Sequence, residues 1–231
     1  MKIIQSFFKK LKYLIKKIYL FRLISYCILP RYSPFKKLIL NKNSIIIDLG
    51  ANIGDKTQYF NDRYKCKIIC YEPNKIAYDI LKKRFKKSSN IICINKGVSK
   101  NEREKKLYYH KQYENDKLDF SQGSSFLDNK ENINSKNFDY VQTLPIYELL
   151  DEHKYIDLIK IDIEGYEYEI IPELISNKNK IKYVIAELHG DPVRKNYDNT
   201  QKNKKLEKKY LDLMNLLNQK KLLDSWFFQY Y

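Results

Sequence analysis

Acidic residues and glycines stand close together after a short apolar run in the first quarter of the 231-residue sequence. In the segment Asp48-Leu-Gly50-Ala-Asn-Ile-Gly54, an acid precedes two glycines, which let the backbone turn tightly and approach a ligand. The segment lacks the G-x-G-x-x-G spacing that places a glycine beside a pyrophosphate. Glu72, which follows 18 residues after Gly54, has the position of an acid that hydrogen-bonds ribose hydroxyls. The pattern favours a nucleoside ligand that carries a cation rather than a phosphate.

S-adenosylmethionine has this chemistry, because it joins a sulfonium cation to a ribose and an adenine without a phosphate. We expect the following residues to contact the cofactor: Asp48, Gly50, Ala51, Asn52, Gly54, Glu72, Pro73 and Asp162. The alternative is purely structural. In that case the two glycines make only a tight turn, and Glu72 is a solvated strand end.

Titratable residues also follow two later apolar runs, and they form the candidate catalytic group: Asp162, Glu164, Glu187 and His189. Both runs are predicted strands that lie side by side in a parallel sheet, so their carboxyl ends bring these side chains together. A hydroxyl group is a poor nucleophile at neutral pH, and a base must take its proton. We predict His189 as the base, because the ordinary pKa of histidine lies nearest to neutral pH, with Asp162 as the alternative. Glu164 could instead stabilise the first turn of the following helix.

The same group contains donors for a divalent cation. Carboxylates with one imidazole suit Mg²⁺ or Mn²⁺ when water completes the coordination shell. The expected ligands are Asp162, Glu187 and His189. A zinc site is not expected, since Cys66 and Cys70 lack a matching pair of cysteine or histidine residues.

Strands and helices alternate from residue 44 onward. Short β-branched runs predict buried strands, and the segments between them predict helices. The expected strands are 44–49, 67–71, 91–95, 156–161 and 183–188, and the expected helices are 55–64, 73–85 and 165–176. This alternation predicts an α/β fold with a mostly parallel sheet and helices on both of its faces. Ligands bind such sheets beyond the carboxyl ends of the strands, where the candidate residues stand.

Two later segments depart from this alternation. Residues 99–143 are rich in tyrosine and asparagine, and they predict an insertion with one or two antiparallel strands. Insertions of this length usually serve a site. Near the C-terminus we expect a lysine- and leucine-rich helix at 204–220 and a final strand within 222–231.

Positive charge is concentrated in the N-terminal arm. The chain has a net charge of +16, yet no acidic residue precedes Asp48, and that stretch holds eleven basic residues. Residues 3–20 predict a basic amphipathic helix, whose lysines would each cost roughly 2.5–3.5 kcal/mol at a bilayer centre and so exclude a membrane span. We expect residues 3–29 either to contact a membrane surface peripherally or to cover one face of the fold. Residues 1–40 are the predicted arm, and residues 41–231 are the predicted domain.

Cysteine usage indicates the compartment. Four cysteines in 231 residues are too few for a disulfide scaffold, and three of them lie within apolar runs that have the composition of strands. We therefore expect reduced thiols and a cytoplasmic protein, which is peripheral on a membrane if the arm binds one.

Taken together, four segments resemble the FkbM family of S-adenosylmethionine-dependent methyltransferases. They are Ile45–Gly54, Cys70–Pro73, Leu158–Gly165 and Ile185–His189. The first two are shared by many class I methyltransferases, whereas Lys160-Ile-Asp-Ile-Glu-Gly165 is characteristic of this family. The resemblance spans about residues 44–190 and implies a Rossmann-like sheet of the seven-stranded type, closed by an antiparallel pair of strands. It also implies O-methylation of a hydroxyl, often on a sugar or a polyketide-derived product.

The sequence thus predicts an O-methyltransferase that acts on a sugar hydroxyl of a glycan or glycoconjugate. One alternative is an RNA methyltransferase, which the basic helix at 204–220 keeps open, although the fourth predicted strand lacks the motif that holds a flipped base, and nucleic acid is not the expected partner. Another alternative is a non-catalytic module that binds the adenosyl group and uses its arm as a membrane anchor.

Overall fold

A computed structural model describes residues 34–130, 132–189, 204–222 and 226–229. The chain divides between Leu38 and Ile39 into two compact units. Of the first unit, the structure describes a short 3-10 helix, η2 (Pro34–Lys37). The helix predicted at 3–20 and the membrane contact predicted at 3–29 lie outside the described residues. No helix in the described ranges is long and apolar enough to cross a membrane.

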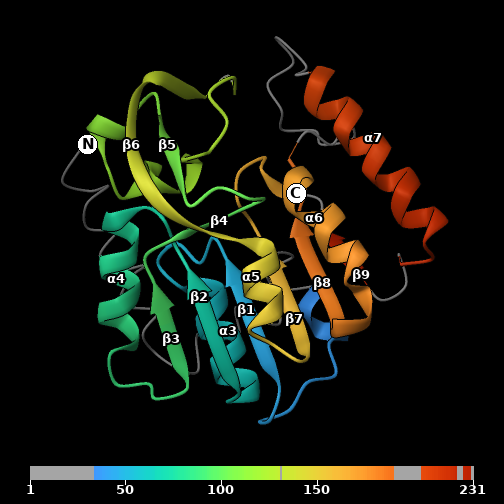
Figure 1. Cartoon of the computed structure of the whole chain (residues 1–231). Helices are drawn as coiled ribbons and strands as arrows, with labels where there is room; N and C mark the ends of the chain where they lie inside the picture. The colour runs from blue at the N-terminus through green and yellow to red at the C-terminus, as the bar shows by residue number, and fades with distance from the viewer. Residues whose placement is uncertain (1–33, 131, 190–203, 223–225, 230–231) are drawn as a thin grey trace. The chain divides into compact units, whose positions relative to one another are not determined.

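The second unit is built on a six-stranded sheet whose neighbouring strands are all parallel (Figure 1). Its strands, in spatial order, are β3 (Ile91–Ile94), β2 (Lys67–Tyr71), β1 (Ile45–Leu49), β7 (Ile156–Ile161), β8 (Ile181–Glu187) and β9 (Trp226–Gln229). The predicted α/β fold with a mostly parallel sheet is confirmed. The strand order reverses between β1 and β7, and such a switch point is where doubly wound sheets bind ligands.

The far edge of the sheet differs from the expected seven-stranded type. Helix α7 (Lys204–Gln219) lies between β8 and β9 in sequence, so the connection is a helical crossover and β9 runs parallel to β8. A seventh strand is not confirmed, and the sheet contains six strands within the described residues. The antiparallel closing pair implied by the resemblance is therefore replaced here by one parallel strand.

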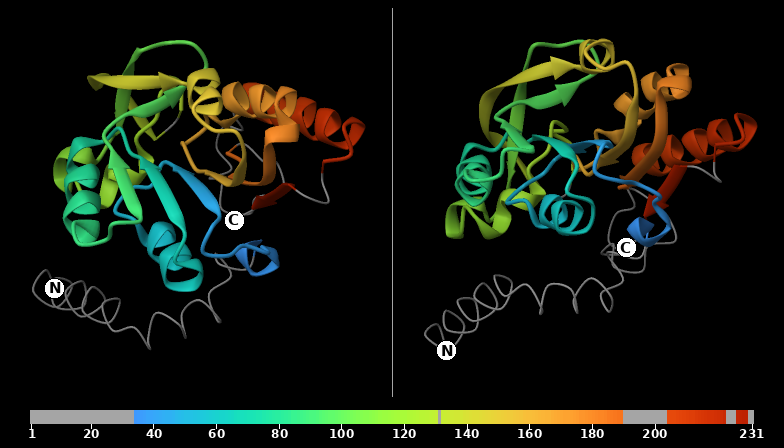
Figure 2. Two further views of the ribbon diagram at one scale, coloured as in Figure 1. Left: turned by 60° about the horizontal axis from the view of Figure 1, so that its bottom comes forward. Right: turned by 90° about the horizontal axis from the view of Figure 1, so that it is seen from below.

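Helices cover both faces of the sheet, as the alternation predicted (Figure 2). Helices α3 (Asp55–Tyr64) and α4 (Lys75–Phe85) follow β1 and β2, and α5 (Ile146–Asp151) and α6 (Glu167–Ser176) flank β7. Successive residues of a strand point to opposite faces. Ile47 and Leu49 consequently join the core against α5 and α6, whereas Asp48 turns towards Thr57 of α3.

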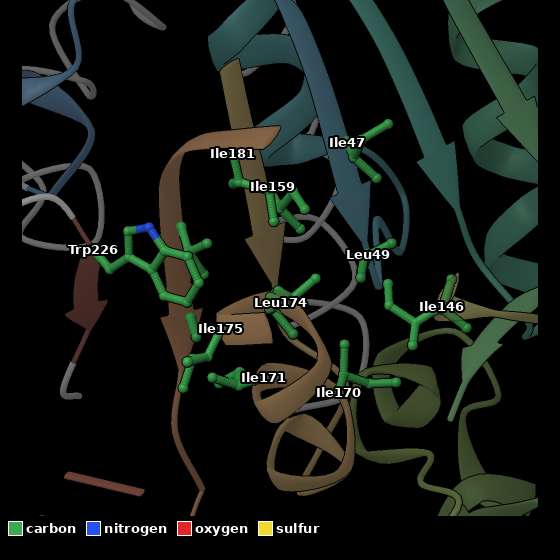
Figure 3. Close-up of a cluster of buried hydrophobic side chains, with 14 of the residues drawn as sticks. Ile47, Leu49, Ile146, Ile159, Ile170, Ile171, Leu174, Ile175, Ile181 and Trp226 are labelled. Carbon is green, nitrogen blue, oxygen red and sulfur yellow. The ribbon is translucent and has the colours of Figure 1, made fainter. Parts of the chain in front are cut away.

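The largest cluster of buried apolar side chains lies between the sheet and the helices α5 and α6 (Figure 3). Ile170, Ile171 and Leu174 on one side of α6 are fully buried, and Trp226 of β9 closes the cluster at the edge of the sheet. These contacts fix α6 against β7 and β8. The turn between β7 and α6, which carries the candidate acids, therefore rests on a rigid base.

Two helices begin later than the sequence predicts, for local reasons. Helix α4 was expected from Pro73 and begins at Lys75, because the Asn74 side chain accepts hydrogen bonds from Ile76 N and Ala77 N and caps the helix. Helix α6 was expected from Gly165 and begins at Glu167. The two residues before Tyr166 have positive φ angles, which are incompatible with a right-handed helix.

The insertion forms a second, small sheet with the order β4 (Gly97–Ser99), β6 (Ile133–Pro145) and β5 (Glu104–His110). The antiparallel pair β5–β6 agrees with the one or two antiparallel strands predicted for the insertion, and β4 adds a parallel strand. Figure 1 shows this sheet at the top, at the end towards which the strands of the main sheet point. The insertion therefore lies on the side of the fold where the candidate site residues stand.

Candidate cofactor and catalytic site

The loop after β1 has a shape that only glycine permits at its two ends. Gly50 has a φ of 73°, and a Cβ atom there would lie 1.9 Å from the carbonyl oxygen of Asp162. Gly54 has a φ of 86°, and a Cβ atom there would lie 2.5 Å from Phe85 of α4. Gly50 thus lets the end of β7 pack against the loop, and Gly54 lets α4 do so. The backbone N–H groups of Gly50 and Ala51 both donate to Tyr71 O, which ties the loop to β2.

Glu72 lies immediately after β2 and is 5% exposed. Its Oε2 accepts a hydrogen bond from Asn52 N at 2.8 Å, and its Oε1 accepts one from Asn74 N at 2.8 Å. Burial raises the pKa of Glu72 to about 7, although both N–H groups act in the opposite direction. Each carboxylate oxygen has a second lone pair. Glu72 is thereby placed to accept two further hydrogen bonds from neighbouring hydroxyls of a ribose.

The turn after Glu72 is fixed from the next strand end. Asn95 donates through its side-chain amide to Glu72 O at 2.8 Å and to Pro73 O at 3.1 Å. Pro73 remains partly exposed. The geometry brings Gly50, Ala51, Asn52, Gly54, Glu72 and Pro73 together in one loop pair. Their predicted contacts with a cofactor stay predictions.

Asp48 lies beneath this loop rather than at its surface. Its carboxylate is fully buried, Thr57 Oγ1 donates to Oδ2 at 2.7 Å, and Lys160 Nζ pairs with Oδ1 at 3.1 Å. In this position Asp48 supports the loop from within the fold. Lys160 links Asp48 to Gly50 O, and the predicted contact of Asp48 with a cofactor stays a prediction.

Lys160 is a functional candidate that the sequence reasoning quoted within a motif but gave no role. Its Nζ donates to Gly50 O at 2.8 Å and lies 3.6 Å from Asp162 Oδ2. Burial lowers the pKa of Lys160, but the charges of Asp48 and Asp162 outweigh burial and raise it above its usual range. A lysine inside an isoleucine-rich strand was the available signal. This ammonium joins the loop of residues 50–54, the predicted cofactor loop, to the end of β7.

The ends of β7 and β8 bring three of the predicted catalytic residues together. Ligand atoms of Asp162, Glu164 and His189 lie within 4.8 Å of one another. Glu187 is the last residue of β8, is half-buried, and is not a member of this group. The sequence had placed Glu187 beside Asp162 and His189 as a metal ligand. In the structure Glu164, rather than Glu187, lies beside Asp162 and His189.

His189 is held between two carboxylates, one at each ring nitrogen. Nδ1 lies 3.1 Å from Glu167 Oε1, and Nε2 lies 3.4 Å from Glu164 Oε2. Burial lowers the pKa of His189, but the two carboxylates outweigh burial and raise it well above its usual value. An imidazolium has no free lone pair. The predicted role of His189 as the base therefore conflicts with its surroundings, and Asp162, whose side chain is 28% exposed, is the better placed acceptor.

Glu164 has a left-handed backbone conformation with a φ of 57°, which non-glycine residues rarely adopt. Lys130 of the insertion donates to its Oε2 at 2.7 Å and to its carbonyl oxygen at 3.0 Å. Burial raises the pKa of Glu164, but His189 and Lys130 outweigh burial and hold it well below its usual range. Charges thus alternate along a chain of four side chains: Lys130, Glu164, His189 and Glu167.

Sequence reasoning missed Lys130 and Glu167 for different reasons. Glu167 is fully buried, and its Oε1 also accepts hydrogen bonds from Ile163 N and Gly165 N. It lies two residues after the quoted motif, so its position at the start of a helix was a usable signal. Lys130 lies 34 residues before Glu164 in an aperiodic insertion, and no pattern connects the two.

The group of Asp162, Glu164 and His189 does not fit a resident divalent cation in this arrangement. Carboxylate oxygens suit Mg²⁺ or Mn²⁺. However, the ammonium of Lys130 and the imidazolium of His189 already neutralise Glu164, and a metal ion would have to displace both.

Comparison with known proteins identifies the class of this fold and site. The profile of the methyltransferase FkbM domain matches residues 48–220, so the chain belongs to the FkbM methyltransferase family. The family and the fold define an S-adenosylmethionine-dependent methyltransferase, and the predicted resemblance is confirmed. No curated protein matches the chain.

One solved structure with a similar arrangement is phosphoethanolamine N-methyltransferase 1 from Haemonchus contortus, in complex with phosphoethanolamine and S-adenosylhomocysteine. It is 12% identical, with a TM-score of 0.42. The match covers 75% of this chain and 28% of that chain. A similarity of this size carries no argument about the acceptor.

Proposed function

We propose that the protein transfers a methyl group from S-adenosylmethionine to a hydroxyl group, most suitably that of a sugar in a glycan or glycoconjugate. The observation that carries the proposal is the place of Asp162. Its carbonyl oxygen lies against Gly50 of the cofactor loop, and its partly exposed carboxylate belongs to the same turn. A proton acceptor thereby stands beside the predicted cofactor site.

The charges around this loop suit a sulfonium. Asp48 and Asp162 carry two negative charges and Lys160 carries one positive charge, which leaves one negative charge next to Gly50. Opposite charges attract strongly where water is largely excluded. Glu72 would hold the ribose hydroxyls at the end of β2, so a cofactor would extend from Glu72 across the loop towards Asp162.

When bound, the cofactor would supply an electrophilic methyl group: the acceptor oxygen would bond to the methyl carbon in line with the breaking carbon–sulfur bond, and S-adenosylhomocysteine would leave. Asp162 would accept the hydroxyl proton as the oxygen attacks, and such assistance is typically worth about 10²–10⁴-fold. Lys160 fixes Asp162 relative to the loop by contacting both. His189 and Glu164 are already paired with each other and would hold the turn in place.

The experiment is a transfer assay with S-adenosylmethionine that carries a labelled methyl group. Free sugars, nucleotide sugars, lipid-linked oligosaccharides and total RNA serve as acceptors, and the product is analysed by mass spectrometry. We expect a methyl ether on a sugar, and we expect Asp162→Asn to lower turnover by roughly 10²-fold or more. Asp151→Asn is the matched control, because Asp151 is largely exposed, lies at the end of α5 and is not one of the candidate site residues. Label on RNA or on nitrogen, or full activity of Asp162→Asn, would refute the proposal.

Several predictions about the whole chain stay proposals. We infer a cytoplasmic protein with a basic arm at 1–40, a methyltransferase domain at 41–231, and peripheral membrane contact through 3–29. The support is the absence of acidic residues before Asp48 and the lysine-rich amphipathic pattern. Removal of residues 1–29 should abolish flotation with anionic vesicles, and cofloating of the truncated protein would contradict the membrane contact.

A further inference from the structure

One segment of the insertion, residues 121–130, contacts the loops after β1, β2 and β7, which carry residues of the candidate site. We call it the strap. Its backbone is anchored to β5, because Ser125 and Tyr108 exchange two hydrogen bonds, of 2.8 and 2.9 Å. Ser121, Ser125 and Lys130 are buried, although all three are polar. Buried polar side chains need partners, and here the partners include groups of the site, although Ser121 Oγ also donates to Leu118 O within the insertion at 2.8 Å.

At one end, the strap contacts the two residues that hold Glu72. Asn52 and Asn74 each donate a backbone N–H to the Glu72 carboxylate. Their side-chain amides both donate to the strap, Asn52 to Ser121 Oγ at 3.1 Å and Asn74 to Ser124 Oγ at 3.5 Å. A ligand that displaces Glu72 would therefore also displace the strap, because Asn52 and Asn74 hydrogen-bond to both.

At the other end, the strap holds the turn that carries Asp162 and Glu164. Ser125 Oγ donates to Glu164 O at 2.7 Å, and Lys130 Nζ donates to the same oxygen at 3.0 Å. A left-handed conformation costs a non-glycine residue on the order of 1–2 kcal/mol. Two donors on one carbonyl oxygen, together with the ion pair of Lys130 with the Glu164 carboxylate, stabilise that conformation.

Apolar side chains of the strap also pack against the turn that carries Asp162 and Glu164. A Cβ atom at Gly165 would lie 3.0 Å from Leu127 Cδ1, and the ring of Phe126 meets the ring of Tyr166 edge-on at 5.4 Å. The strap is thus fitted to the turn by apolar contacts as well as by hydrogen bonds. A shift at one end of such a segment is transmitted to the other, because packed side chains have few alternative arrangements.

We propose that Ser121 and Lys130 are positioning residues, and that the strap couples occupancy of the cofactor site to the conformation of the turn that carries Asp162. The proposal rests on the proposed function, since it takes Glu72 as the ribose acceptor and Asp162 as the base. Neither Ser121 nor Lys130 touches the reacting atoms. They act through Asn52 and Glu164, so that the acceptor meets a correctly placed Asp162 only after the cofactor has bound.

The test is hydrogen–deuterium exchange on the full chain, with and without S-adenosylhomocysteine. At a ligand concentration of about ten times Kd, exchange that requires ligand release slows roughly tenfold. We expect this slowing in residues 50–54, 121–130 and 162–166 of the wild type. In Ser121→Ala and in Lys130→Met, the slowing should persist at 50–54 and fall to less than about twofold at 162–166.

Matched variants separate positioning from a general structural effect. Ser135→Ala and Lys136→Met alter exposed residues of β6 in the same insertion, and both should behave as the wild type. Ser121→Thr and Lys130→Arg keep the donor or acceptor and should restore the slowing at 162–166. Thermal unfolding identifies any variant that does not fold, in which case its conservative partner, compared with the wild type at low and high ligand concentration, decides.

The outcomes distinguish the two proposals. No slowing at 50–54 in the wild type refutes the cofactor site and, with it, the coupling. Slowing at 50–54 without slowing at 162–166 refutes the coupling alone. Equal slowing at 162–166 in the wild type and in both strap variants also refutes the coupling, because the cofactor then acts on the turn directly.

Discussion

Glu72 and Glu164 are both glutamates that follow a parallel strand of the same sheet, yet their surroundings move their pKa values in opposite directions. Burial raises the pKa of Glu72 to about 7, and only backbone N–H groups contact its carboxylate within the described residues. Burial also raises the pKa of Glu164, but the charges of His189 and Lys130 outweigh burial and hold this pKa well below its usual range. The partners of the two carboxylates make the difference.

The partners of the two carboxylates suggest different roles: Glu72 keeps acceptor capacity for a ligand, whereas Glu164 stabilises the fold. Neutral N–H donors leave Glu72 with unused lone pairs and an unsatisfied charge, which ribose hydroxyls can meet. Glu164 is neutralised by two cations of its own chain and has little to offer a ligand. Under the proposed function, the β1–β2 side of the site would bind the cofactor, whereas the ion pairs of the β7–β8 side fix the conformation of the turn.

Lys160 joins the two sides, and its removal should have the largest effect. Lys160→Met leaves Asp48 buried without its charge partner and frees Gly50 O. Loss of one member of a buried ion pair typically costs about 3–5 kcal/mol. Urea unfolding should show a decrease of this size. Lys180→Met, which removes an exposed partner of Asp151, should change stability by less than about 1 kcal/mol, and an equally small effect of Lys160→Met would contradict the account.

Glu164→Gln should remove the ion pair between Glu164 and His189 at the ends of β7 and β8. Removal of this carboxylate should lower the pKa of His189, which nuclear magnetic resonance titration of labelled histidine can follow. A histidine whose pKa is raised on folding contributes stability that is complete below its unfolded value near 6.5 and is lost as pH rises through its folded pKa. The wild type should therefore lose stability in the alkaline range.

In Glu164→Gln this alkaline loss should be smaller, and stability at neutral pH should fall by roughly 2 kcal/mol. Glu104→Gln, an exposed residue of β5, is the control and should leave the histidine titration unchanged. An unaltered His189 pKa in Glu164→Gln would show that the alternating chain of charges is not the cause of the shift.

If Glu72 binds the cofactor, the affinity for S-adenosylhomocysteine should depend on pH. With a pKa of about 7 in the free protein, Glu72 is mostly protonated at pH 6 and mostly ionised at pH 8. If only the carboxylate accepts the ribose hydroxyls, affinity for S-adenosylhomocysteine should rise roughly tenfold between these values. Glu72→Gln should bind weakly at both pH values, without this rise. A wild-type affinity that falls as pH increases would contradict the assignment.

The central part of the fold was predictable because its signals are local. Patterns of only a few residues predict three of its elements, and the structure has them at the predicted positions. They are the β-branched strand before Gly50, the helix Asp55–Tyr64 and the strand Lys67–Tyr71. The helix starts were less predictable. The cap by Asn74 and the left-handed Glu164 depend on backbone geometry that residue types indicate only weakly.

The site was predictable only where its residues stand directly after strands. Asp162, Glu164 and His189 were expected together and lie together, because parallel strands end at one edge. Lys130 could not be expected, since it reaches Glu164 from an insertion whose fold depends on tertiary contacts. The base was assigned to His189 from its ordinary pKa, and that reasoning omits the two carboxylates that hold its ring.

The central claim is that Glu72 binds the ribose of an adenosyl cofactor, and calorimetric titration with S-adenosylhomocysteine tests it most directly. The full-length wild type and Glu72→Ala are compared at pH 8, with thermal unfolding as a check on folding. We predict that the substitution weakens binding by about 2 kcal/mol, roughly 30-fold in Kd. Equal affinities of the folded wild type and the folded variant would contradict the claim.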